Sequence, residues 1–217
     1  MMRTTIYKKG GVPTTMRAPE CIGKLILEKQ LKVIAEIGIY ICSMSDQVRN
    51  YVNKKYYGQY ALTQKGDPIE EYWMVDPYPY NYKCGSLGGD KITNDKWDEW
   101  YYSACKRMIA DKTVRLLRLT SVKAAKLFPD DYFDLVYIDA DHTKESVKED
   151  CATWLPKVRE GGILCGHDYG GGWQSVVNGV DEFFIERSGK KDITHFYEID
   201  GGEKYYRMDS GVWVVEL

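Results

Sequence analysis

Residues 133–142 read FDLVYIDADH, an apolar run that ends in two aspartates and a histidine. A short run of apolar, β-branched and aromatic residues bounded by polar ones is typical of a buried strand. Ligands of open α/β sheets bind beyond the carboxyl ends of the strands, where such polar residues lie. The stretch therefore predicts an α/β sheet and the edge of that sheet at which chemistry is expected.

Strand and helix patterns alternate on both sides of this stretch. Further strands are predicted over 31–38, 71–77, 114–120 and 161–168, and helices over 45–56, from Asn94 onward as the N-cap, over 121–128, from Thr143 to Pro156 and over 173–187. Five strand-then-helix units favour right-handed crossovers and a mostly parallel sheet with helices on both faces. The last two strand patterns, within 193–217, have no helix between them and predict an antiparallel C-terminal hairpin.

Residues 1–30 lie outside this alternation and are predicted to be an N-terminal extension or cap, with a short helix around Ile22 and Ile26. Residues 31–217 are predicted to form a single α/β domain, which suits their number. The Tyr-, Pro- and Gly-rich segment 78–94 is too long for an ordinary connection and is a candidate lid over an acceptor site.

The composition of the 217 residues is that of a globular chain, with 44% hydrophobic and 29% charged residues and a formal net charge of −2. Basic and acidic residues are interspersed, which argues against a nucleic-acid partner. No apolar run approaches the roughly 20 residues that span a bilayer, and the N-terminus lacks the apolar stretch of a secretory signal. The six cysteines form no C-x-x-C pair, so we expect a reduced, cytoplasmic chain.

Polar side chains end all five predicted parallel strands, which is more than helix capping alone accounts for. In chain order they are Glu36, Asp76, Thr120, Ser121, Asp139, Asp141, His142, His167 and Asp168, and Gly38 lies beside the first of them. An acid at the end of the second strand is placed to accept hydrogen bonds from the two hydroxyls of a ribose. The position of Asp76 before Pro77 is equally typical of a turn.

Asp139 and Asp168 follow strands that are predicted to be neighbours, so their carboxylates are expected to converge. Such groups repel unless a cation joins them, and oxygen ligands with one imidazole suit Mg²⁺, Mn²⁺ or Fe²⁺. The alternative is that Asp139 caps the next helix while His167 and Asp168 lie in a solvated loop. His142 is a candidate base or substrate-binding residue, because it adjoins Asp141 at the mouth of the site.

Four segments in this order resemble class I S-adenosylmethionine-dependent methyltransferases: VIAEIG (33–38), WMVD (73–76), FDLVYIDADH (133–142) and GGILCGHDY (161–169). Within that class the chain is most similar to small bacterial-type O-methyltransferases with I-D-G-D-H and G-G-x-x-x-G-H-D-Y motifs, and more distantly to metal-dependent sugar O-methyltransferases. The resemblance covers roughly residues 19–217. The pairing of the last two motifs is fairly specific, whereas the first motif is not.

The resemblance implies a Rossmann-like, seven-stranded sheet whose last strand is antiparallel. It implies S-adenosylmethionine as the cofactor, with contacts from Glu36, Gly38, Asp76, Thr120, Ser121 and Asp139. It also leaves open a second cofactor, Mg²⁺ or another divalent cation, with Asp139, His167 and Asp168 as its ligands. Asp141, beside His142, is then the candidate catalytic base.

Two residues depart from the family pattern. Cys42 stands where a second glycine is usual, so its Cβ is expected to crowd the methionine end of the cofactor. His167 replaces the more usual acid of the metal pair. Both departures leave open a non-catalytic, methyltransferase-like binding protein as the alternative.

The predicted function is O-methylation of a small hydroxylated acceptor such as a sugar or a natural product. The expected partner is that small molecule, with no nucleic acid and no membrane, and a homo-oligomer stays open. A nicotinamide-dependent oxidoreductase is a weaker alternative, because GIYICSM (38–44) lacks the G-x-G-x-x-G turn.

Overall fold

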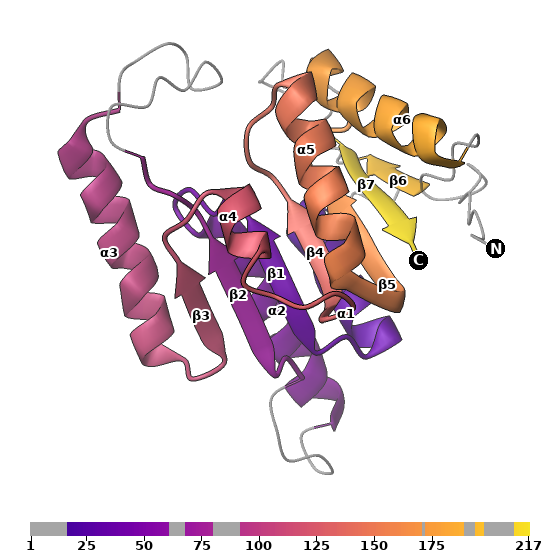
Figure 1. Cartoon of the computed structure of the whole chain (residues 1–217). Helices are drawn as coiled ribbons and strands as arrows, with labels where there is room; N and C mark the ends of the chain where they lie inside the picture. Colours follow the sequence, from indigo (N-terminus) through magenta and orange to yellow (C-terminus); the bar gives the residue numbers. More distant parts are fainter. Residues whose placement is uncertain (1–16, 61–67, 80–91, 171, 189–193, 198–210) are drawn as a thin grey trace, which may run out of the picture.

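The computed structural model describes residues 17–60, 68–79, 92–170, 172–188, 194–197 and 211–217 (Figure 1). Most of the candidate lid, residues 80–91, lies outside these ranges. Within the described part of the chain, no helix combines the length and the apolar character needed to cross a membrane.

One mixed sheet organises the fold. Its strands are β1 (Val33–Ile37), β2 (Glu71–Val75), β3 (Val114–Leu117), β4 (Phe133–Ile138), β5 (Val158–Gly166), β6 (Thr194–Tyr197) and β7 (Gly211–Glu216). They lie in the order β3-β2-β1-β4-β5-β7-β6, with β1 to β5 parallel and β7 antiparallel to both β5 and β6. The predicted α/β sheet with an antiparallel C-terminal hairpin is therefore confirmed.

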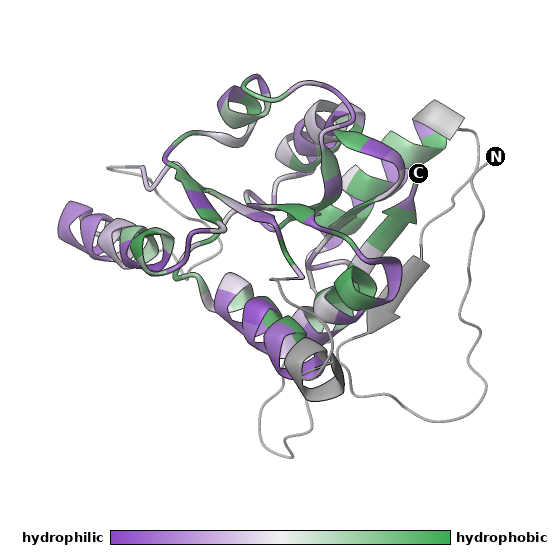
Figure 2. Cartoon of the chain, turned by 90° about the horizontal axis from the view of Figure 1, so that it is seen from below, coloured by the Kyte–Doolittle hydropathy of each residue, from purple (hydrophilic) through white to green (hydrophobic). Residues whose placement is uncertain are grey.

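Helices cover both faces of this sheet (Figure 1). They are α1 (Ala18–Lys29), α2 (Ser43–Tyr60), α3 (Asn94–Ala110), α4 (Ser121–Ala125), α5 (Lys144–Trp154), the short 3₁₀ helix η2 (Leu155–Lys157) and α6 (Gln174–Ser188). One buried cluster joins α1, α2 and α3 to the sheet, and a second joins α4, α5 and α6 to the opposite face. Figure 2 shows the strands as largely hydrophobic and the helices as carrying hydrophilic residues on their outer sides.

The alternation of side chains along β1 explains why two clusters form. Ile34 packs in the cluster of α1 to α3, whereas Ala35 and Ile37 pack in the cluster of α4 to α6. Successive strand residues point to opposite faces, and both faces of a parallel sheet are covered, so the strand is apolar throughout except at Glu36. The buried carboxyl of Glu36 consequently faces the α1–α3 side.

Two helix boundaries show what local chemistry decides. Thr93, not Asn94 as predicted, is the N-cap of α3, and its hydroxyl accepts a hydrogen bond from the Lys96 amide at 3.3 Å. The first amides of a helix have no carbonyl acceptor within the helix, and the threonine hydroxyl supplies one. Thr143 caps α5 in the same way, and α5 ends at Trp154, two residues before Pro156, as predicted.

The N-terminal helix belongs to the core. Ile22 and Ile26 of α1 are each 1% exposed and pack in the cluster with α2 and the sheet. The short helix predicted within residues 1–30 is therefore present, and it covers one face of the sheet.

Candidate active site

A cavity of about 610 Å³ lies at the carboxyl ends of the central strands. A volume of this order is typical of a site for a small molecule or cofactor. Seven of the predicted residues line it: Gly38, Asp76, Thr120, Ser121, Asp139, Asp141 and His142. The sheet brings them together from four separate strand ends, as the sequence predicted.

Asp76 anchors the loop that follows β1. Its Oδ2 accepts hydrogen bonds from the amides of Ile39 and Tyr40 at 3.1 and 3.0 Å, and its Oδ1 accepts one from the Tyr78 amide at 2.8 Å. Burial raises the pKa of this carboxyl, although the three amides act in the opposite direction. Asp76 thus ties the β1–α2 loop to the end of β2 while lining the cavity.

Gly38 allows two backbones to meet beneath the cavity. It has a φ of +84°, and a Cβ placed there would lie 2.0 Å from the carbonyl oxygen of Asp139. Only glycine combines this left-handed conformation with the absence of a side chain. The loops after β1 and β4 can therefore approach each other closely only because residue 38 is glycine.

Two histidines and two aspartates form a compact cluster at the ends of β4 and β5. His142 Nε2 lies 2.9 Å from Asp168 Oδ2 and 3.4 Å from Asp139 Oδ1. His167 Nδ1 lies 3.2 Å from Asp168 Oδ1 and 3.9 Å from Asp139 Oδ2. The predicted convergence of Asp139 and Asp168 is therefore present in the structure.

The charges of this cluster compensate one another. Burial lowers the pKa of His142, but hydrogen bonds to Asp139 and Asp168 outweigh it and raise that pKa to about 9. Burial raises the pKa of Asp168, yet the two histidines hold it below its ordinary value. Without a bound metal ion, the two carboxylates favour the protonated form of His142, which weighs against its predicted role as a base.

The ligand atoms that could share one metal ion come from Asp139, His142 and Asp168, and they lie within 4.8 Å of one another. The sequence assigned the third position to His167, whereas the structure places His142 there. Both histidines contact the two aspartates, but only the ring nitrogen of His142 groups with both carboxylates closely enough to share one ion. The set of two carboxylates and one imidazole suits a divalent cation.

Asp141 has a structural contact as well as a place in the cavity. Its Oδ1 accepts a hydrogen bond from the Thr143 amide at 2.8 Å, just before α5 begins. The carboxylate also lines the cavity, so Asp141 stays the candidate base that the sequence predicted.

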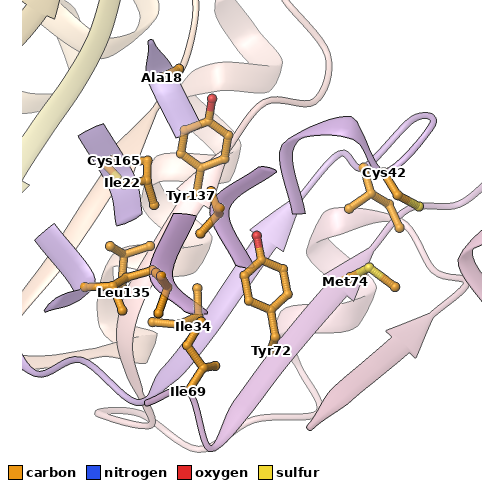
Figure 3. Packing of buried hydrophobic residues seen from close by; sticks show 14 of the residues in the cluster. Ala18, Ile22, Ile34, Cys42, Ile69, Tyr72, Met74, Leu135, Tyr137 and Cys165 are labelled. Atoms are coloured by element: carbon orange, nitrogen blue, oxygen red, sulfur yellow. The ribbon is translucent and has the colours of Figure 1, made fainter. Parts of the chain in front are cut away.

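Glu36 does not line the cavity, contrary to the prediction. It is 1% exposed, and its Oε2 accepts a hydrogen bond from the Tyr72 hydroxyl at 2.6 Å. Burial raises the pKa of Glu36 to about 8. The alternation of β1 directs this carboxyl to the face covered by α1 to α3, where its partner Tyr72 belongs to the buried cluster. Figure 3 shows Tyr72 among the residues of that cluster.

Cys42 does not crowd the cavity, which corrects a second prediction. It is fully buried among the residues of the α1–α3 cluster (Figure 3), and its Sγ lies 4.0 Å from the Tyr78 hydroxyl. Its φ is +62°, a value that favours glycine. Cysteine in place of the family glycine therefore strains the backbone but takes no space from the cavity.

This strain predicts an unusual order of stabilities. Cys42→Gly and Cys42→Ala both lose the buried thiol, but only glycine relieves the left-handed conformation, which costs other residues about 1–2 kcal/mol. We expect the glycine variant to be as stable as the alanine variant or up to about 1 kcal/mol more stable, by urea unfolding. Affinity for S-adenosylhomocysteine should stay within about twofold of the parent.

Cys151 provides the matched control, because it is equally buried but lies in the ordinary helix α5. Cys151→Ala should be more stable to unfolding than Cys151→Gly by about 1 kcal/mol, because a helix interior prefers alanine to glycine by about that amount. The same order at both positions would mean that Cys42 is not strained.

Other residues that line the cavity were not predicted as site residues, among them Tyr40, Trp97, Asp150 and Trp173. Trp173 stacks on His142 with 4.5 Å between ring centroids. These residues lie on helices or within loops, away from the strand ends, and the abundance of Tyr and Trp was the only signal for the aromatic ones.

Comparisons with known proteins agree with this geometry. A family model described as a methyltransferase domain matches residues 40–169, whereas no curated protein sequence matches the chain. An O-methyltransferase from Bacillus cereus in complex with SAH is similar in structure, with a TM-score of 0.58 and 15% identity over 95% of this chain and 83% of that one. The O-methyltransferase TomG from Streptomyces achromogenes, in complex with SAM, has a TM-score of 0.58 and 16% identity over 95% and 81%. Spermidine synthase from Thermotoga maritima has a TM-score of 0.54 and 11% identity over 89% and 56%.

Proposed function

Since the chain belongs to the methyltransferase domain family, we propose that it methylates a hydroxyl group of a small acceptor with S-adenosylmethionine as the methyl donor. The observation that carries this proposal is the cavity at the carboxyl ends of the strands, floored by Gly38 and flanked by Asp76. The solved structures of similar fold that contain SAM or SAH support the choice of cofactor.

The residues around the cavity suit the parts of that cofactor. Asp76 retains lone pairs beside its three amide partners, so it can accept the ribose hydroxyls. Gly38 lets the backbones after β1 and β4 meet at the cavity, and Thr120 and Ser121 line it where the base is expected. When bound, S-adenosylmethionine supplies an electrophilic methyl group, so the task of the chain is to hold an acceptor oxygen in line with it.

Asp141 is the residue that we assign to the acceptor proton. It lines the cavity, and the Thr143 amide, which donates to its Oδ1, fixes the carboxylate at the mouth of the site. A hydroxyl is a weak nucleophile near neutral pH, so removal of its proton assists the transfer. His142 and Trp173 form the adjoining wall, where the stacked rings offer a flat surface to an acceptor.

A divalent cation fits the donor set of Asp139, His142 and Asp168. Bound there, it would supply Lewis-acid chemistry that lowers the pKa of an acceptor hydroxyl. A sugar or a natural product as acceptor, a cytoplasmic location and a homo-oligomeric state remain predictions from the sequence.

The proposal is tested first by binding and then by transfer. Isothermal calorimetry of the full chain should give saturable binding of S-adenosylhomocysteine. Methyl transfer is then measured against panels of sugars, phenols and amines with labelled donor. Absence of cofactor binding would exclude the function, whereas binding without transfer to any panel would favour the non-catalytic alternative.

The cation site makes a separate prediction. Mn²⁺ titrated into metal-free protein should bind with a stoichiometry of one, seen by calorimetry or electron paramagnetic resonance. Asp139→Ala should weaken this binding at least about tenfold, because a charged ligand is lost. His142→Ala should weaken it more than His167→Ala does, and the reverse order would restore His167 as the ligand.

A further inference from the structure

Three side chains form a hydrogen-bonded chain between α4 and α5. Trp154 Nε1 donates to Ser121 Oγ at 2.8 Å, and the Ser121 hydroxyl donates to Asp150 Oδ1. Trp154 is fully buried and Asp150 is 5% exposed. The Ser121 hydroxyl hydrogen is committed to Asp150, so Ser121 has no hydrogen to offer a ligand.

Asp150 keeps one carboxylate oxygen without a partner. Asp150 lines the cavity. Among the described residues, its Oδ2 makes no hydrogen bond and its carboxylate forms no ion pair. The charged groups that act on it are Glu149 and Asp141, both acidic. A carboxylate buried without a cation requires hydrogen-bond donors, and a neutral ligand N–H group in the cavity would supply them.

The strand order indicates which part of a nucleoside reaches Asp150. Asp76 ends β2, whereas Thr120 and Ser121 follow β3, the next strand toward the edge of the sheet. With the ribose at Asp76 and the amino-acid part at β1, the base extends beyond β2 toward Ser121. Because Ser121 and Asp150 both line the cavity and are hydrogen-bonded to each other, we expect the edge of the base beside the open oxygen of Asp150.

Resting on the function proposed above, we propose that Asp150 accepts a hydrogen bond from the exocyclic amine of adenine and so selects a 6-amino purine over a 6-oxo purine. Ser121 and Trp154 are positioning residues that fix the orientation of the carboxylate. An amine donates to a carboxylate, whereas a carbonyl at the same place repels it, so the selection follows from the chemistry of the two groups. Burial raises the pKa of Asp150 to about 6, and the carboxylate is therefore ionised at pH 8.

The test compares two ligands that differ only at this position. Calorimetry at pH 8 measures the affinities of S-adenosylhomocysteine and of its deaminated 6-oxo counterpart, S-inosylhomocysteine. The parent chain should prefer the 6-amino ligand at least about tenfold, the factor expected for one hydrogen bond to a charged group. Asp150→Asn keeps an oxygen for Ser121 and turns an amide donor toward the cavity, so the preference should fall at least tenfold or invert.

Glu149→Gln is the matched control, because Glu149 also lines the cavity and loses one charge. It should keep the preference of the parent chain. The inference would be overturned if the parent bound the two ligands with equal affinity, or if Asp150→Asn kept the preference of the parent. The three side chains would then only connect α4 to α5. A parent chain that binds neither ligand would overturn the proposed function itself.

Discussion

Replacing Asp76 with alanine is expected to weaken binding of S-adenosylhomocysteine at least about hundredfold and to lower the free energy of unfolding by about 2–5 kcal/mol. The variant removes two proposed hydrogen bonds to the ribose, each worth about 1.5–3 kcal/mol when the acceptor is charged. It also leaves the amides of Ile39, Tyr40 and Tyr78 without their carboxylate partner. Calorimetry and urea unfolding measure the two effects.

Asp134 supplies a control at the opposite end of the sheet. Its Oδ2 accepts hydrogen bonds from the amides of Lys32 and Val33 at 2.6 and 2.8 Å, so it too anchors backbone next to β1. Asp134→Ala should also destabilise the chain, but the affinity for S-adenosylhomocysteine should be unchanged once the protein is folded. Equal losses of affinity in both variants would show that stability, and not the position of Asp76, controls binding.

Gly38→Ala is expected to cost about 3–5 kcal/mol of stability and to abolish cofactor binding. The new Cβ would lie 2.0 Å from the Asp139 carbonyl oxygen, far inside van der Waals contact, and its other neighbours are also backbone atoms. Backbone cannot rotate aside as a side chain can, so the loops after β1 and β4 must separate. Thermal unfolding and calorimetry measure the two losses.

Gly161→Ala isolates the contribution of the dihedral angle. Gly161 has a similar φ of +73°, but the nearest atom to an added Cβ is Arg159 Nη1 at 3.6 Å. This variant should cost only about 1–2 kcal/mol and should bind the cofactor normally. If the two variants were equally stable, the contact with Asp139 would not be the cause of the loss at Gly38.

The fold was predictable because hydrophobic periodicity is a local property. The runs at 31–38 and 133–139 are apolar on both faces, as parallel strands between two helical layers require, and the structure places strands in both. Boundaries were less predictable, since they depend on single contacts such as the cap at Thr93. That threonine and Asn94 are both good capping residues, and backbone geometry chose between them.

The site was predictable only where a strand ends. Asp76 and Asp139 were found because every parallel strand delivers its last residues to one edge of the sheet. Glu36 was misplaced although it lies two residues after Ile34 and therefore shares its face of β1, which packs against α1 to α3. The grouping of His142 with Asp139 and Asp168 was not predicted, and neither was the left-handed backbone of Asp168, whose φ is +57°.

Both ends of β1 are fixed by carboxylates from neighbouring strands. Asp134 holds the amides that enter the strand, the carbonyl of Val75 receives the Gly38 amide at 2.8 Å, and Asp76 holds the next two amides. Amide hydrogens with such partners exchange with solvent only when the segment opens, so deuterium uptake along this stretch should be slow before any ligand arrives. The binding edge at β1 is therefore preorganised, and ordering this segment adds little conformational entropy cost to the capture of a nucleoside.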